Sequence, residues 1–270
     1  GVRLYKNIGA MKFKEVSHHS GINNSLNTMA GIWGDYNNDG LTDLYLVNYR
    51  GKNGKAQSNR LYKNLGNGQF KDVTKKLNLI DLDLSSSAAW ADYDNDGDLD
   101  LFVANYGEIW TENKDIHGYS QADRLYRNDG NKFVDVTIQA KVGGISHKTH
   151  GLLKIDHNQI AANRGFTFQP VWFDFNNDNL ADVFITQDFG TSQLYKNNGD
   201  GSFTNVTKRM GLTVYGTGMG VSISDVNQDG YWDLLVTTGN KNQLWINQKG
   251  RYFINKIDDF KLADKQRFGW

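Results

Sequence analysis

Residues 33–48 read WGDYNNDGLTDLYLVN, an acidic loop between two segments rich in the residues typical of strands. Asp35, Asn37, Asp39 and Asp43 stand at positions 1, 3, 5 and 9 of this loop, and Gly40 stands at position 6. The whole chain has 30 basic and 30 acidic residues and no formal net charge. The crowding of oxygen-bearing side chains is therefore local and requires a local explanation.

The same pattern returns three times, and a second pattern follows each copy. The other copies of the first pattern are WADYDNDGDLDLFVAN (90–105), WFDFNNDNLADVFITQ (172–187) and ISDVNQDGYWDLLVTT (223–238). The second pattern reads LYKNLGNGQFKDVT (61–74), LYRNDGNKFVDVT (125–137), LYKNNGDGSFTNVT (194–207) and LWINQKGRYFINKI (244–257), with a further copy, LYKNIGAMKFKEV, at 4–16. An internal repeat of this kind is the strongest single indication of the fold.

Each full repeat predicts four strands: a strand, the acidic loop, a strand, a variable connection, a strand, a Gly/Asn turn and a last strand. Alternating side chains and short Gly/Asn turns are typical of antiparallel hairpins. Four-stranded sheets repeated around an axis form a β-propeller. We expect an all-β, single-domain propeller over 1–270, with an open stack of hairpins as the alternative. The expected blades cover about 29–74, 86–137, 168–207 and 219–257.

The two ends of the chain predict one more, split blade. Residues 1–16 supply the last two strands of a repeat, and RFGW at 267–270 resembles the start of another. A split blade built from 1–16 and 266–270 closes a five-bladed ring. Two alternatives remain open: the chain is part of a larger propeller, or a neighbour completes its incomplete blade. The second alternative provides unpaired backbone groups at which strands add and copies assemble.

The acidic loops predict calcium sites. They offer hard oxygen ligands without His or Cys, and this donor set favours Ca²⁺ over zinc or copper. Position 7 varies freely, as expected where only its backbone carbonyl binds, and position 6 is Gly or Asn, both of which tolerate positive φ. EF-hands are excluded, because position 12 carries no Glu and lies in a strand; the residues there are Leu46, Val103, Ile185 and Val236.

With these loops, nearly the whole chain resembles the FG-GAP/VCBS repeat family of calcium-binding, integrin-α-like propellers. The resemblance implies about four Ca²⁺ per chain, with Asn179 in place of Gly and the missing fifth loop as departures from the pattern. It implies the following ligands, including the position-7 carbonyls: Asp35, Asn37, Asp39, Leu41 and Asp43; Asp92, Asp94, Asp96, Asp98 and Asp100; Asp174, Asn176, Asp178, Leu180 and Asp182; Asp225, Asn227, Asp229, Tyr231 and Asp233. Carboxylates this crowded repel one another, so the ions are expected to be part of the fold.

The long connections are the expected binding face. In a four-stranded meander the acidic loops and short turns share one edge, and 49–59, 106–123 and 138–167 share the other. Long loops on a rigid scaffold are where binding sites usually lie. Candidate ligand-binding residues there are Arg50, Lys52, Trp110 and Tyr119. The structural alternatives are a solvated basic loop and aromatic side chains packed on a blade.

Composition narrows the function. Cysteine is absent, no apolar run reaches the ~20 residues that span a bilayer, and no basic stripe interleaved with aromatics points to nucleic acid. The chain starts GVRLYKN, without a signal-peptide pattern, and is expected to be a mature or excised segment. Because millimolar external calcium fills even weak sites, an extracellular, secreted or cell-surface location is expected.

We therefore expect an extracellular binding, adhesion or assembly module whose partners are proteins, polysaccharides or copies of itself. The resembled family includes integrin-like receptors and lectin-like sugar binders. The alternative is a lectin or a lyase-type, carbohydrate-active enzyme that uses the long-loop face, with Glu108, Glu112 and Asp123 as candidate acids. No nucleophile elbow, HExxH, P-loop or Rossmann signature supports the enzyme.

Overall fold

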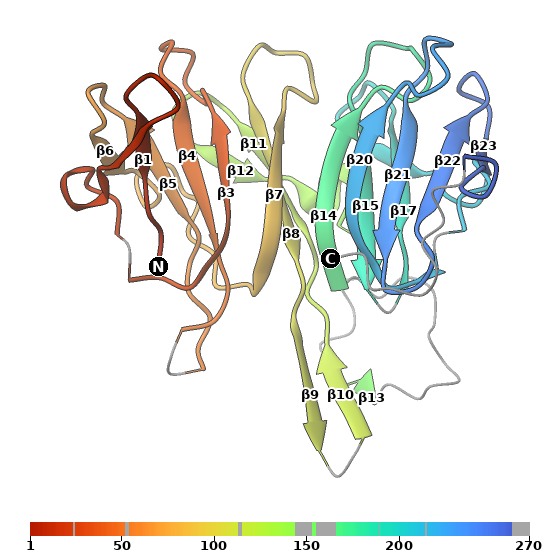
Figure 1. Cartoon of the computed structure of the whole chain (residues 1–270), viewed down its shortest axis with the longest axis horizontal. Helices are drawn as coiled ribbons and strands as arrows, with labels where there is room; N and C mark the ends of the chain where they lie inside the picture. Colours follow the sequence, from red (N-terminus) through yellow and green to blue (C-terminus); the bar gives the residue numbers. More distant parts are fainter. Residues whose placement is uncertain are drawn as a thin grey trace.

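A computed structural model describes residues 1–23, 25–51, 54–112, 115–143, 153–154, 166–188, 190–213 and 215–260. The described chain is almost entirely β, with four antiparallel four-stranded sheets arranged side by side as blades (Figure 1). This confirms the expected all-β propeller fold class. We number the blades 1 to 4 in chain order.

Each blade is a meander in which successive blade strands pair. Blade 1 contains β3 (Thr28–Gly34), β4 (Asp43–Asn48), β5 (Arg60–Asn64) and β6 (Phe70–Asp72). Blade 2 contains β7 (Ser85–Ala91), β8 (Asp100–Asn105), β11 (Arg124–Asn128) and β12 (Phe133–Asp135). Blade 3 contains β14 (Phe166–Phe173), β15 (Asp182–Asp188), β17 (Gln193–Asn197) and β18 (Phe203–Asn205). Blade 4 contains β20 (Gly218–Ser224), β21 (Asp233–Thr238), β22 (Gln243–Asn247) and β23 (Phe253–Asn255).

A two-stranded half-blade precedes blade 1. It consists of β1 (Tyr5–Asn7) and β2 (Phe13–Glu15), and the 3₁₀ turn Ser17–His19 follows it. The Phe70 amide donates to the Ser20 carbonyl at 2.7 Å, just as Phe133 donates to Leu77 between blades 1 and 2. The half-blade therefore occupies the place of the last two strands of a preceding blade. The expected partner segment, 266–270, lies outside the described residues.

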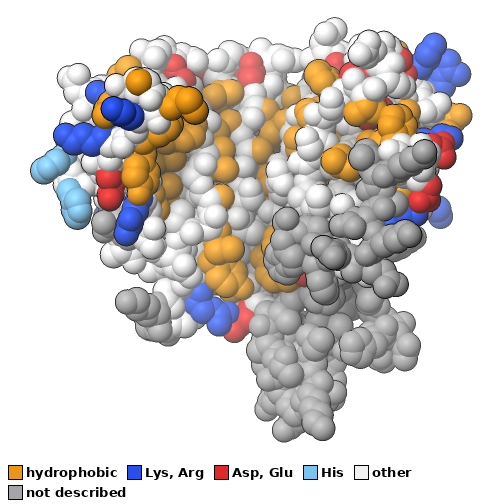
Figure 2. Space-filling view, in the orientation of Figure 1, with side chains coloured by type: hydrophobic (Ala, Val, Ile, Leu, Met, Phe, Trp, Pro, Cys, Tyr) orange, Lys and Arg blue, Asp and Glu red, His pale blue; other side chains and the backbone are white. Residues whose placement is uncertain are grey.

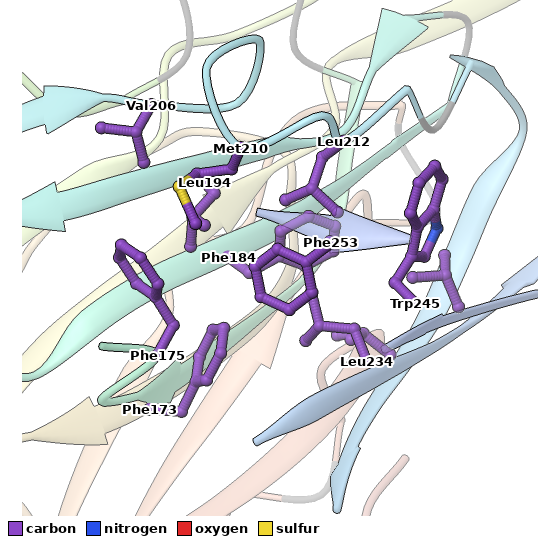
Figure 3. Close-up of a cluster of buried hydrophobic side chains, with 12 residues drawn as sticks. Phe173, Phe175, Phe184, Leu194, Val206, Met210, Leu212, Leu234, Trp245 and Phe253 are labelled. Atoms are coloured by element: carbon purple, nitrogen blue, oxygen red, sulfur yellow. The ribbon is translucent and has the colours of Figure 1, made fainter. Parts of the chain in front are cut away.

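Strand alternation builds the core between the blades. In β4, Tyr45 and Val47 point into the cluster shared with blade 2, whereas Leu44 and Leu46 point toward the half-blade. Opposite faces of one strand thus belong to two different interfaces, as the period of two requires. Figure 3 shows the interface of blades 3 and 4, where aromatic and aliphatic side chains from both blades point toward one another, among them Phe173, Phe175, Phe184, Leu234, Trp245 and Phe253.

Close approach of blades 1 and 2 depends on a glycine. A Cβ on Gly34, the last residue of β3, would lie 2.7 Å from Cδ1 of Trp90 in β7. The Trp90 ring in turn packs edge-on against Tyr45, with 6.1 Å between ring centroids. The missing side chain at position 34 therefore makes room for the indole of the next blade.

The connection after β8 is folded rather than a plain loop. Residues expected as the 106–123 loop form β9 (Glu108–Glu112) and β10 (Asp115–Tyr119), and β10 also pairs with β13 (Leu153–Lys154). This sheet projects from the end of the blades opposite the acidic loops (Figure 1). Shorter elements are the helix α1 (Thr137–Ala140) and the pair β16 (Gly190–Thr191) and β19 (Tyr215–Gly216). In the described part of the chain, no helix has the length and apolar character needed to cross a bilayer.

Candidate metal centres

The four acidic loops each join the first and second strands of a blade, at one shared edge of the molecule (Figure 1). They span 35–42, 92–99, 174–181 and 225–232, and the position-9 Asp of each begins the second strand. We call them loops 1 to 4, after their blades.

Each loop turns through two left-handed residues, at positions 4 and 6. Position 6 was expected to have positive φ; Asn179, which replaces Gly there, has a φ of 64°. The positive φ at position 4 was not expected from the sequence, although only Asn or Gln occurs there. The left-handed residues are Asn38 and Gly40, Asn95 and Gly97, Asn177 and Asn179, and Gln228 and Gly230. Asn and Gly are the residues that adopt this conformation most readily.

The position-1 carboxylate organises the turn. In loop 3, Asp174 Oδ1 accepts from the Asp178 amide at 3.1 Å and Asp174 Oδ2 accepts from the Asn179 amide at 2.7 Å. The same pair of bonds is present at Asp35, Asp92 and Asp225. The backbone thus winds around the first carboxylate, which brings the side chains of later positions toward one centre.

Burial raises the pKa of the position-9 carboxylates. These four side chains have at most 1% exposure. Loss of solvation, partly offset by two backbone N–H donors, brings the pKa of Asp43 to about 6 and those of Asp100 and Asp182 to about 7, and it also raises the pKa of Asp233. A negative charge at these positions is unfavourable unless a cation compensates it.

The side-chain oxygens of the position-3 asparagines in loops 1 and 3 indicate whether a cation fits the loops. Asn37 Oδ1 and Asn176 Oδ1 are buried and accept no hydrogen bond, while the amide nitrogens of both residues are engaged by loop carboxylates. A buried oxygen without a donor is costly, and a bound metal ion would satisfy it. In loops 2 and 3, three carboxylates also converge, with oxygens within 4.8 Å of one another: Asp92, Asp94 and Asp100, and Asp174, Asp178 and Asp182. The donor set fits a hard divalent cation.

Lysines partly neutralise two of the loops. Lys63 Nζ lies 2.9 Å from Asp39, and Lys196 Nζ lies 2.5 Å from Asp178. Both pairs involve the position-5 carboxylate and are partly exposed to solvent. Such exposed pairs contribute little stability, so the lysines do not replace an ion.

The residues predicted for ligand binding have different environments. Arg50, which follows β4, forms an ion pair with Glu108 of β9 at 2.6 Å, so the pair connects blade 1 to the projecting sheet. Lys52 lies outside the described residues. Trp110 and Tyr119 lie on β9 and β10, in the projecting sheet. Asp123, a candidate acid, is fully buried and accepts from the Asn105 amide and the Thr167 hydroxyl.

The sequence profile of the FG-GAP-like repeat matches residues 35–103 and 174–236. The chain carries FG-GAP-like repeats. Each match starts at the position-1 Asp of one loop and ends in the strand that follows the next, so the repeat and the acidic loops coincide.

Cartilage acidic protein 1 of Xenopus tropicalis is 25% identical over 215 residues, which cover 77% of this chain and 30% of that protein. The chain therefore spans about a third of the length of this relative. Two solved structures each give a TM-score of 0.49: an Agrocybe aegerita lectin that recognises non-reducing terminal N-acetylglucosamine (15% identity, 94% of this chain, 59% of the lectin), and BBS1N in complex with ARL6DN (11%, 87% and 58%).

Proposed function

We propose that this protein is a calcium-stabilised, extracellular binding module with about four ions per chain. The observation that supports it most strongly is the pair of buried, donor-free oxygens of Asn37 and Asn176 beside raised-pKa carboxylates. The ligands would be the side chains at positions 1, 3, 5 and 9 and the carbonyl of position 7. When bound, calcium supplies charge compensation and fixes the loop conformation.

The proposed location follows from affinity. The sites are short loops with a neutral carbonyl ligand, and loops 1, 3 and 4 also have one amide ligand. Such sites are expected to bind weakly, with dissociation constants of about 10⁻⁴ to 10⁻³ M as in extracellular modules. Such sites fill outside cells and remain largely empty in resting cytosol. We therefore propose function in an extracellular, secreted or cell-surface setting, with a protein or a polysaccharide as partner.

Metal counting tests the calcium sites directly. The purified chain is dialysed against about 10 mM calcium, well above the expected dissociation constants, and bound ions are counted by mass spectrometry of the metal. About four ions are expected, and Asp174→Ala should remove one of them. Asp200→Ala is the matched control, because Asp200 lies in the β17–β18 turn, outside the acidic loops, and its carboxylate accepts from the amide and hydroxyl of Ser202. Equal ion counts for the two variants would contradict the assignment.

The binding face is proposed to be the edge with the long connections. The Arg50–Glu108 pair joins blade 1 to β9 there. The centroid of the Tyr106 ring lies 5.2 Å from that of Phe166 and 4.9 Å from that of Phe168. Aromatic and Arg side chains on a rigid support are typical of binding surfaces. A glycan and protein array probed with the wild type and with Arg50→Ala tests this face: binding to one class that the variant loses supports it. Binding that is unchanged in the variant would exclude Arg50 from the contact.

Assembly through the half-blade is a second candidate. The described residues place no strand on the outer edge of β1, and Tyr5, Phe13 and Trp33 are 50%, 63% and 48% exposed. Figure 2 shows hydrophobic side chains gathered over β1 and β3. Tyr5 and Trp33 line a groove of about 560 Å³ there. A strand from a second copy would cover this edge. Sedimentation over a range of concentrations should then show reversible self-association that Phe13→Asp weakens; a monomer at all concentrations would refute it.

An enzymatic role, the remaining candidate, has weaker support. Of the three candidate acids, Asp123 is buried among hydrogen-bond donors and Glu108 is paired with Arg50. Incubation with a panel of acidic polysaccharides tests for lyase activity by the ultraviolet absorbance of unsaturated products. Product formation that Glu108→Gln abolishes would establish the enzyme over the binding module.

A further inference from the structure

The third strand of every blade ends in Asn. In blades 2 to 4 this residue bonds to the acidic loop of its own blade, to the turn that follows the strand and to the acidic loop of the preceding blade. In blade 3 the backbone N–H of Asn197 donates to Asp182 Oδ1 at 2.7 Å. The side-chain oxygen, Asn197 Oδ1, accepts from the backbone N–H of Gly199 at 2.9 Å. Its Nδ2 donates to the Ala181 carbonyl of its own loop at 3.1 Å and to the Tyr93 carbonyl at 2.7 Å. Tyr93 is position 2 of the loop in the preceding blade. One buried amide therefore links two successive loops.

The same arrangement recurs at both other junctions between full blades. Asn128 Nδ2 donates to the Tyr36 carbonyl at 2.8 Å, and Asn247 Nδ2 donates to the Phe175 carbonyl at 2.8 Å. Each of these asparagines also holds the position-8 carbonyl and the position-9 carboxylate of its own loop. Asn128, Asn197 and Asn247 are at most 1% exposed.

Asn64 in blade 1 is the exception: within the described part of the chain it makes the bonds within its own blade but lacks the bond to a preceding blade. It makes the same bonds inside its blade, to Asp43, Thr42 and Gly66. No acidic loop precedes blade 1 among the described residues, so its Nδ2 reaches no second loop, and its side chain is only partly buried. Asn64 thus provides a control within the same chain.

These bonds form a continuous path along the edge. Asp182 Oδ2 accepts from the Phe175 amide at 3.2 Å, and the carbonyl of that same residue accepts from Asn247. Asn247 in turn donates to Asp233, which accepts from the Val226 amide. In loops 1 to 3, the position-2 residue therefore connects its own position-9 carboxylate to the Asn of the next blade.

We propose that the asparagines at positions 128, 197 and 247 couple neighbouring calcium loops, so that ion binding at one loop favours binding at the next. This proposal rests on the proposed calcium function. In an ion-free loop, carboxylate repulsion favours open conformations in which the position-2 carbonyl is displaced. Binding of the ion holds that carbonyl in place to accept from the Asn side chain of the next blade. The backbone amide of the same Asn then positions the position-9 carboxylate of the next loop. The coupling is an interaction free energy between two neighbouring sites, so each site raises the calcium affinity of the other by the same factor.

A second contact between loops supports the coupling. Asn38, at position 4 of loop 1, donates to the Gly97 carbonyl at 3.0 Å and to Asp98 at 2.8 Å in loop 2. Asn177 in loop 3 likewise donates to the Gly230 carbonyl of loop 4 at 3.1 Å. Asn95, the equivalent in loop 2, makes no such bond within the described part of the chain. Position 4 therefore adds a surface contact at two of the three junctions.

Calcium titration by calorimetry tests the coupling. The wild type is expected to bind with a Hill coefficient above about 1.5, because coupling of about fivefold or more between neighbours is typical of linked sites. Asn197→Ala should lower the Hill coefficient but keep it above 1, because Asn128 and Asn247 still join the other two pairs of loops. Asn64→Ala, which removes the equivalent side-chain bonds inside one blade, should leave it unchanged. A wild-type coefficient for Asn197→Ala, or an equal fall for Asn64→Ala, overturns the proposal.

A second pair of variants keeps the test valid if Asn197→Ala does not fold. Asn177→Gly retains the left-handed backbone, whose φ is 58°, and removes only the exposed amide; Asn95→Gly is the matched control with the same φ. Only Asn177→Gly should lower the Hill coefficient, and by less than Asn197→Ala, because Asn247 still joins loops 3 and 4; equal coefficients for the two variants exclude the position-4 contact from the coupling. Independent binding of several ions by the wild type would refute the coupling alone, whereas absence of ion binding would refute the calcium function as well.

Discussion

Asp81→Asn is expected to stabilise the protein at pH 8 and to have a much smaller effect at pH 4.5. Asp81 lies away from the acidic loops, where Asn59 Nδ2 and the Tyr126 hydroxyl each donate to it at 3.3 Å. Burial, followed by repulsion from Asp83, raises its pKa from 3.8 to about 7. The folded protein therefore binds this proton more tightly than the unfolded chain, and its stability falls as pH rises from about 4 to about 7.

The magnitude follows from that shift. About three pH units at about 1.4 kcal/mol each give at most about 4 kcal/mol of stability lost by pH 8. A carboxamide retains a hydrogen bond with Asn59 and with the Tyr126 hydroxyl but carries no charge, so the variant avoids this loss. Urea unfolding at both pH values and at one calcium concentration measures the difference between the two proteins.

The control is Asp258→Asn, whose carboxylate is 72% exposed, and it should show no such pH-dependent gain. A gain for Asp81→Asn that is the same at pH 4.5 and pH 8 would refute the electrostatic reasoning. It would show that the carboxamide stabilises the site by packing or hydrogen bonding alone.

Four further substitutions test the backbone and the packing. Gly34→Ala places a Cβ 2.7 Å from the Trp90 ring and should lower the unfolding free energy by about 1–3 kcal/mol, measured with urea; an unchanged midpoint would show that the blades adjust freely. Gly97→Ala, at a φ of 93° with open space around it, should lose about 1–2 kcal/mol through backbone strain alone, whereas Asn179→Gly should raise the melting temperature; a reversal of these signs contradicts the turn geometry. Phe184→Ala, fully buried between blades 3 and 4, should cost about 3–5 kcal/mol, and a loss below 1 kcal/mol would contradict the inter-blade core.

Much of the fold was predictable because the repeat is local and strict. The alternation of Leu44 and Leu46 against Tyr45 and Val47 gives two buried faces, and four copies of it require each blade to lie between neighbours. Positive φ at position 6 was likewise visible in the sequence, because Gly or Asn stands there in every loop. These features depend on residues close together in the chain.

The rest depended on contacts between distant residues. Asn197 stood in the repeated LYKN pattern, but its bond to Tyr93 arises only when two blades meet across 104 residues. The strands of the 106–123 connection carry no clear alternation, so a loop was expected where β9 and β10 pair. Asp123 was a candidate acid of the enzyme alternative, and only the tertiary structure shows that it is buried against Thr167. The repeated Asn at the end of the third strand was visible in the sequence, but its bonding partners in the preceding blade were not.

Thermal unfolding of the whole chain in calcium and in chelator tests the central claim most directly. One site filled at a hundred times its dissociation constant stabilises the folded state by about 2.7 kcal/mol, and four such sites act together. The account predicts a large fall in melting temperature on chelation that added calcium reverses, with magnesium at the same concentration restoring much less. A melting temperature that does not differ between calcium and chelator, in a chain shown to carry no bound metal, would contradict it.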